Sequence, residues 1–272
     1  MLFLRDICKS NHPIYPIYAI LFPIIIILVT VYDYFLSLGD HMIVLFTIKP
    51  IPVFLMVMCG IAYMKIYKIH IYAELMTLGL LMCLIGDIFM MLYYPPLFDD
   101  LKMILFGSIA FSIARVCMII AIITYPYSIN SKRFIATTPW RLILCGIPSA
   151  GYFAGCVFIL VTNNLDNLMT GLITTYLFLV TVQMFFASLR VKSFAIESLK
   201  SQLFGLFGTL FFTVSDSLLL YDMFISSIPI GHIISMTFYW VGMYLLTISM
   251  VRNDNYDIEK MGEEQYLLVD GL

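Results

Sequence analysis

The chain has 272 residues, of which 62% are hydrophobic and 12% are charged. Soluble domains carry roughly 25% charged residues, so this composition excludes an ordinary soluble globular protein. The formal net charge of −2 gives no indication of a nucleic-acid partner, and none is expected. In a membrane protein, the position of each charge along the chain carries more information than the sum.

Eight apolar segments follow one another along the chain, each close to the 20 or so residues that a membrane-spanning helix needs. They are residues 15–37, 42–62, 72–94, 103–125, 141–161, 168–189, 202–224 and 230–251. Their connections are too short to hold a folded soluble domain. The sequence therefore predicts an all-α fold: a polytopic membrane bundle of eight transmembrane helices within residues 15–251.

Lysines and arginines alternate between the two sides of this predicted bundle. They occur in the N-terminal tail, after the second, fourth and sixth segments, and in the C-terminal tail. The connections after the first, fifth and seventh segments have none, and the one after the third has only Lys102. Short cytosolic loops are enriched in positive residues. The pattern predicts that both termini are cytosolic, with residues 1–14 forming the N-terminal tail.

The six cysteines lie in or near apolar segments, and none has C-x-x-C spacing. They are interpreted as small buried hydrophobic residues, so no disulfide framework, metal site or cofactor is expected.

Four charged residues fall inside the predicted spans. Asp87, Asp216 and Lys49 each lie about seven or eight residues from the same, non-cytosolic end of their segments. At about 1.5 Å per residue, all three lie roughly 10–12 Å below that surface, and Arg115 lies nearer the middle. Charges that share a depth on separate helices predict one polar cavity that opens toward the non-cytosolic side. Gly86 and Ser215 directly precede the two aspartates, and their small size would let the backbone or a ligand approach closely.

Two interpretations of this polar set remain open. A charged side chain near the bilayer centre costs about 2.5–3.5 kcal/mol on insertion scales. The set could consist of structural ion pairs, in which the two cations neutralise the two aspartates and fix helix register. A functional site is favoured because small and hydroxyl residues would fix register at lower cost.

Several short motifs follow one another in a characteristic order. They are "KPIP" with Lys49 and Pro50, "GD" with Gly86 and Asp87, "FGSIAF" with Phe106, Gly107 and Phe111, "GTLFFTVSD" with Gly208, Phe212, Ser215 and Asp216, and "FYWVGMYLL" with Tyr239. In order, spacing and helix placement they resemble the eight-span, YhhN-like lysoplasmalogenase family. Members of that family hydrolyse the vinyl ether bond of lysoplasmalogens and release a fatty aldehyde and a glycerophospho-base.

The resemblance implies a hydrolase in which Asp87 and Asp216 are the catalytic acid–base pair. No cofactor is implied, and the substrate would be a lysophospholipid that enters from the bilayer. Residues that would bind the substrate or tune the two aspartates are Lys49, Arg115, Ser215, Gly86 and Tyr239.

The chain departs from the family pattern at three positions. Arg115 and Met118 stand where the family carries a histidine and a tyrosine, and Met243 stands near an expected glutamine. A permanent cation at residue 115 would favour the ionised form of a neighbouring aspartate. The alternatives are therefore a non-catalytic lipid-binding relative and a lipid or proton-coupled transporter.

The last segment, residues 252–272, is polar and acidic and is expected to be a flexible cytosolic tail. It contains "YLLV" and "EEQYLL", which resemble sorting signals that adaptor proteins read. The family resemblance implies the endoplasmic reticulum, and the signals indicate an endosomal or lysosomal membrane as the alternative.

Overall fold

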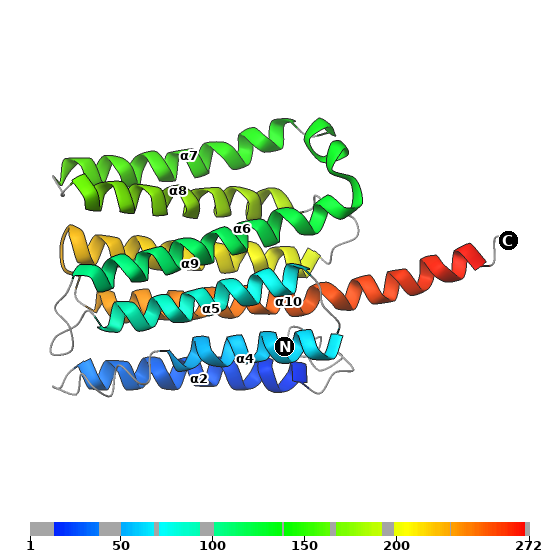
Figure 1. Cartoon of the computed structure of the whole chain (residues 1–272), viewed down its shortest axis with the longest axis horizontal. Coiled ribbons are helices and arrows are strands. Elements are labelled where there is room, and N and C mark those ends of the chain that lie inside the picture. The colour runs from blue at the N-terminus through cyan, green and yellow to red at the C-terminus, as the bar shows by residue number, and fades with distance from the viewer. Residues whose placement is uncertain are drawn as a thin grey trace.

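The computed structural model contains helices and no strand in the part of the chain that it describes (Figure 1). The described residues are 14–37, 50–67, 71–92, 101–137, 139–163, 167–191, 199–228 and 230–269. The helices are α2 (Ile14–Ser37), α4 (Ile51–Tyr67), α5 (Ile71–Leu92), α6 (Leu101–Thr137), α7 (Pro139–Thr162), α8 (Asn167–Arg190), α9 (Leu199–Phe224) and α10 (Gly231–Val269). The predicted all-α class is confirmed.

Six of these helices, α5 to α10, are long and apolar enough to cross a bilayer. Among the residues whose side chains are described, α2 and α4 have apolar stretches at Leu21–Tyr32 and Ile51–Lys65, and α2 as a whole has 24 residues. Large apolar side chains point outward along the bundle, as expected where a surface faces lipid; Phe158 is 70% exposed. The chain is therefore an integral, multi-pass membrane protein. The count of eight spans and the cytosolic position of both termini stay predictions.

Two helices run past the ends that hydropathy predicts. The α6 helix continues from the predicted end at residue 125 to Thr137, and α10 continues from residue 251 to Val269. Polar composition predicts a flexible tail after residue 251; α10 continues through this segment, and its flexibility stays a prediction. Extending an existing helix adds a hydrogen bond per residue without a new nucleus, and this segment has no proline.

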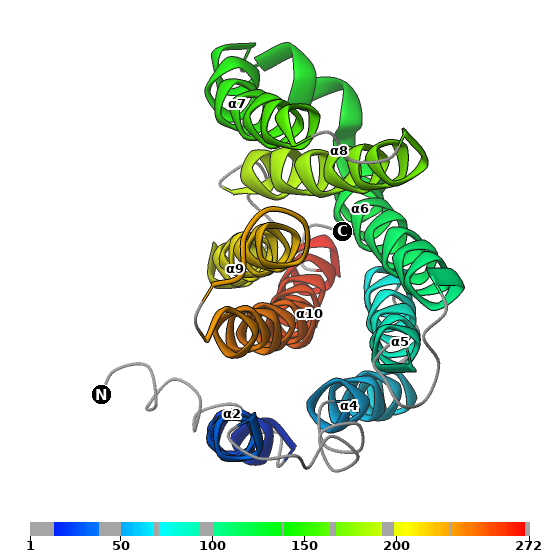
Figure 2. The ribbon, with the colours of Figure 1, turned by 90° about the vertical axis from the view of Figure 1, so that its left-hand side faces the viewer.

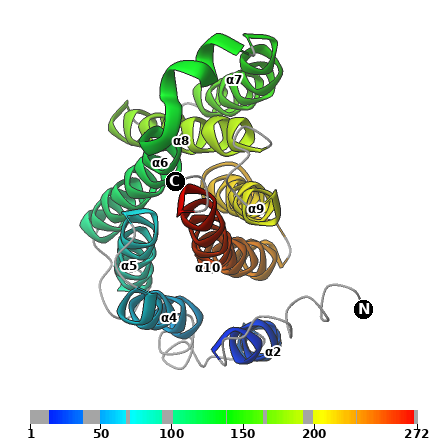
Figure 3. The same cartoon turned by 90° about the vertical axis from the view of Figure 1, so that its right-hand side faces the viewer.

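The helices form a curved row around a central pair (Figures 2 and 3). The row runs through α2, α4, α5, α6 and α8, and the pair is α9 and α10. The α10 helix packs against α9, α2, α4 and α5, whereas α7 lies outside the row against α8. The main core fills the space around α10 and includes Trp240, Met243 and Leu246.

The α9 and α10 helices touch through glycine. A Cβ added at Gly208 would lie 2.9 Å from the carbonyl oxygen of Gly242, and one added at Gly242 would lie 2.9 Å from the carbonyl oxygen of Gly208. Small residues let two membrane helices bring their backbones together in this way. The contact fixes the two helices that carry Asp216 and Tyr239.

Candidate active site

One cavity is shared by five helices at the end of the bundle where α5 and α9 end and α6, α8 and α10 begin. Its volume is about 80 Å³, which is room for several water molecules. Most of the lining is methionine, leucine, isoleucine and phenylalanine. The polar lining residues are Asp87, Ser108, Tyr176, Ser215, Asp216 and Tyr239. The structure thus brings the two aspartates of α5 and α9 to one cavity, as the sequence predicts.

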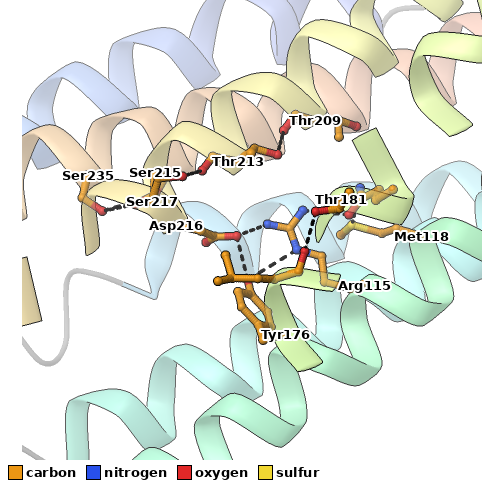
Figure 4. A network of polar contacts seen from close by, with 12 residues as sticks. Arg115, Met118, Tyr176, Thr181, Thr209, Thr213, Ser215, Asp216, Ser217 and Ser235 are labelled. Atoms are coloured by element: carbon orange, nitrogen blue, oxygen red, sulfur yellow. Dashed lines mark hydrogen bonds and ion pairs between the residues drawn. The ribbon is translucent and has the colours of Figure 1, made fainter. Parts of the chain in front are cut away.

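Asp216 is held by an ion pair and a phenol. Its carboxylate is 8% exposed, and its Oδ2 accepts a hydrogen bond from the Tyr176 hydroxyl at 2.7 Å. The same oxygen accepts a hydrogen bond from Nη2 of Arg115, which also makes the ion pair (Figure 4). A neighbouring guanidinium favours the ionised form of a carboxyl group, and burial opposes it.

Arg115 is fully buried behind Asp216 and has a protein partner at each guanidinium nitrogen. Besides the bond to Asp216, Nη1 donates to Oε1 of Gln183 at 2.7 Å and Nε donates to the Tyr176 hydroxyl at 3.4 Å. The ring centroid of Phe212 lies 3.5 Å from the guanidinium carbon, so the cation also stacks on an aromatic face. Arg115 therefore acts on the cavity through Asp216.

Asp87 has a different set of partners. It is also 8% exposed, and its Oδ2 accepts a hydrogen bond from the Tyr239 hydroxyl at 2.8 Å. Edge-on contacts with Phe111 and Phe212, at centroid distances of 6.4 and 5.2 Å, hold the Tyr239 ring.

Gly86 and Ser215 shape the cavity through packing. A Cβ added at Gly86 would lie 2.8 Å from the Phe111 ring, so the glycine lets Phe111 form the cavity wall. Ser235 Oγ donates to the carbonyl oxygen of Ser215 at 2.9 Å, and the two hydroxyl oxygens are 3.3 Å apart. This pair joins α9 to α10 beside Asp216.

Lys49, which the sequence places in the site, lies outside the described residues. Met118 and Met243, the other two departures from the family pattern, are both fully buried. Met118 lies beside the Arg115 network, because Nε2 of Gln183 is 3.7 Å from its sulfur. Met243 belongs to the core around α10.

Two members of the Arg115 network, Tyr176 and Gln183, do not follow from the sequence reasoning above. Both are on α8, seven residues apart, so they lie on one helix face. The sequence signal for these two residues is an amide inside an apolar segment, two helical turns after a tyrosine.

The described residues hold no group of three or more histidine, cysteine, aspartate or glutamate side chains that could bind a metal ion. Five of the six cysteines are described and are free thiols, and Cys8 lies outside the described residues. The polar groups that line the cavity are two carboxyl groups, two phenols and the hydroxyl groups of Ser108 and Ser215.

Comparison with known proteins gives a family. A model of the YhhN family matches residues 44–250, which include every residue that lines the cavity. No curated protein and no solved structure matches the chain.

Proposed function

This chain belongs to the YhhN family, and we propose from that membership and the shared cavity that it is a lysoplasmalogenase-like hydrolase. It would cleave the vinyl ether bond of a lysoplasmalogen to a fatty aldehyde and a glycerophospho-base. The observation that carries the proposal is that two carboxyl groups with different partners line one small cavity.

Vinyl ether hydrolysis needs an acid and an anion in the same place. Protonation of the β-carbon creates an oxocarbenium ion, water adds to it, and the resulting hemiacetal collapses to aldehyde and alcohol. One carboxyl group must be protonated to start this sequence. A second must be ionised to stabilise the cation and then to activate water. Glycosidases divide the same tasks between two carboxyl groups.

The partners of the two aspartates support an assignment of these roles. Asp216 has the cation Arg115 beside it, so it is the anion that stabilises the oxocarbenium ion and activates water. Asp87 is then the acid, because two carboxyl groups in one site of low polarity are not both charged. A protonated Asp87 can keep the bond from Tyr239 on Oδ2 and carry its proton on Oδ1.

The size of the cavity supports entry from the membrane. A volume of about 80 Å³ accommodates the vinyl ether and the attacking water, with the remainder of the lipid outside. The largely apolar lining suits the chain of a lysophospholipid. Lys49 is proposed to bind the substrate phosphate. The C-terminal segment is proposed to bind sorting adaptors. The proposed compartment is the endoplasmic reticulum.

An assay of the purified full-length protein tests the proposal. Vinyl-ether and ester lysolipids are supplied side by side, and released aldehyde is measured by mass spectrometry. We expect aldehyde from the vinyl-ether lipid alone, with Asp87→Asn and Asp216→Asn each lowering the rate about 10²–10⁴-fold, the usual contribution of acid–base groups.

Asp222→Asn is the matched control, because Asp222 lies on α9 near Asp216 but outside the cavity lining. Its Oδ1 accepts a bond from the backbone N–H of Ile228, which an asparagine retains. Unchanged aldehyde release by the Asp87 and Asp216 variants would contradict the proposal.

One observation favours a second function. Both Arg115 and Tyr176 donate to a single oxygen of Asp216, which is the arrangement of a stable structural ion pair. A lipid-binding relative without catalytic activity would use the same cavity to hold a lysolipid. Tight binding of the vinyl-ether lipid without any aldehyde release would favour this function over hydrolysis.

A further inference from the structure

A second hollow lies between α4 and α5, in the half of α5 that is remote from Asp87. Its volume is about 940 Å³, near the upper end of the range of about 300–1,000 Å³ for small-molecule sites. It is lined by Val57, Ile61 and Met64 of α4, which are three and four residues apart, and by Thr77, Leu78 and Leu81 of α5. We call it the α4–α5 groove.

Close packing sets the floor of the α4–α5 groove. A Cβ added at Gly60 would lie 2.5 Å from Oγ1 of Thr77, so the two helices meet there at the closest distance a glycine allows. Thr77 is 4% exposed, and its hydroxyl donates to the sulfur of Met250 on α10 at 3.7 Å. By contrast Leu78, on the wall, is 40% exposed. The floor of the groove is therefore closely packed, and its wall is exposed.

Two opposite charges line the same end of the groove. Lys65 is two residues from the end of α4, and Glu74 is in the first turn of α5. The α4 helix ends at Tyr67, α5 begins at Ile71, and the two helices pack against each other. Both charges therefore lie at the same end of the pair, the predicted cytosolic face. No ion pair joins the two side chains in the described part of the chain, so each is available to a ligand.

We propose that the α4–α5 groove binds a membrane phospholipid whose head group carries both a phosphate and a primary ammonium, as in an ethanolamine phospholipid. Lys65 pairs with the phosphate and Glu74 accepts hydrogen bonds from the ammonium. One acyl chain follows the apolar walls from Lys65 to Val57, a length of about 12 Å at 1.5 Å per residue. This lipid site is separate from the proposed hydrolase site and does not depend on it.

The two charges select the head group. A choline head group has no N–H to donate to Glu74, and a glycerol head group has no cation to meet it. Lipids of identical acyl chains therefore separate head-group recognition from simple filling of an apolar hollow.

Native mass spectrometry of the delipidated full-length protein tests the proposal. Ethanolamine, choline and glycerol phospholipids with the same chains are titrated in turn. We expect the ethanolamine lipid to bind about tenfold tighter than the other two, as charge-assisted hydrogen bonds imply. Lys65→Ala and Glu74→Ala should each remove this preference, and Lys65→Glu combined with Glu74→Lys should restore it. Lys200→Ala, a lysine of α9 at the same end but outside the groove, should retain it.

Leu78→Trp distinguishes the occupants of the groove. The larger ring fills the wall and should lower the affinity for all three lipids without changing helix content. Equal binding of the three lipids, unaffected by Lys65→Ala and Glu74→Ala, would mean an annular lipid only and would overturn the proposal. A dimer of the purified protein that disappears in Leu78→Trp would assign the groove to a second copy of the chain and would also overturn it.

Discussion

Asp87 and Asp216 share one cavity and have the same exposed fraction, 8%, yet their surroundings differ. Asp216 meets a buried guanidinium and a phenol, and Asp87 meets a phenol from α10. Burial alone would penalise the charge of both carboxyl groups alike. The partners differ, and this difference is the basis for the roles proposed for the two carboxyl groups.

The difference begins in the helices that supply the partners. Arg115 of α6 reaches Asp216 on α9 with support from Gln183 on α8, so three helices meet at the charged side. Asp87 of α5 meets Tyr239 of α10, whose ring is clamped by two phenylalanines. An extended polar network holds one side and aromatic packing holds the other. The polar partners of each aspartate can be replaced separately, and Phe212 contacts both Arg115 and Tyr239.

The largest effect is expected from removing the cation. Arg115→Leu leaves Asp216 buried without its ion-pair partner, a change that typically costs about 3–5 kcal/mol. The free energy of unfolding, measured by denaturant titration of the protein in detergent, should fall by that amount.

The double variant Arg115→Leu with Asp216→Asn sharpens this test. It removes both charges, so most of the lost stability should return, because an uncompensated buried charge is no longer present. A double variant as unstable as Arg115→Leu would mean that Arg115 acts mainly through its contacts with Phe212 and Gln183.

A smaller loss of stability is expected from a substitution at the contact between α9 and α10. Gly208→Ala places a methyl group 2.9 Å from the carbonyl oxygen of Gly242, and overpacking of this kind costs about 1–3 kcal/mol. Because α9 must shift relative to α10, aldehyde release should fall together with stability.

Gly151→Ala on α7 provides the control for Gly208→Ala. A Cβ at Gly151 meets no atom within 4 Å, so stability and aldehyde release should both be unchanged. A Gly208→Ala variant that behaves like Gly151→Ala would show that the α9–α10 contact is looser than its geometry indicates.

The sequence predicts the depth of the charged residues well but not their pairing. Depth follows from counting residues at about 1.5 Å each, and this count was enough to bring Asp87 and Asp216 to one level. Pairing depends on which helix faces which. The Gly208–Gly242 contact, which sets the position of α9 against α10, exists only in three dimensions. Sequence reasoning accordingly left open which aspartate Arg115 would neutralise.

Composition is a weak guide to the remainder of the chain. The polar segment after Arg252 was expected to be flexible, and α10 continues through it to Val269. The sequence does not predict a role for Gln183, because a single amide in an apolar run has little effect on hydropathy. Its importance comes from Arg115, whose Nη1 it accepts at 2.7 Å. An isolated polar side chain inside a membrane segment therefore indicates a buried polar partner on a neighbouring helix.

The smallest changes in aldehyde release are expected from removing the hydroxyl groups of Tyr239 and Tyr176 one at a time. Tyr239→Phe removes the donor from Asp87 Oδ2, whereas Tyr176→Phe leaves Asp216 with Arg115. Loss of the hydrogen bond from Tyr239 to Asp87 should lower aldehyde release about tenfold. Loss of one of two donors to an ion-paired carboxylate should lower it about threefold. The two rates are measured at saturating vinyl-ether lysolipid, so that differences in substrate binding do not enter. Equal losses would mean that the two aspartates are equivalent and that the charge on Arg115 is shared across the cavity, which would remove the basis for assigning Asp87 as the acid.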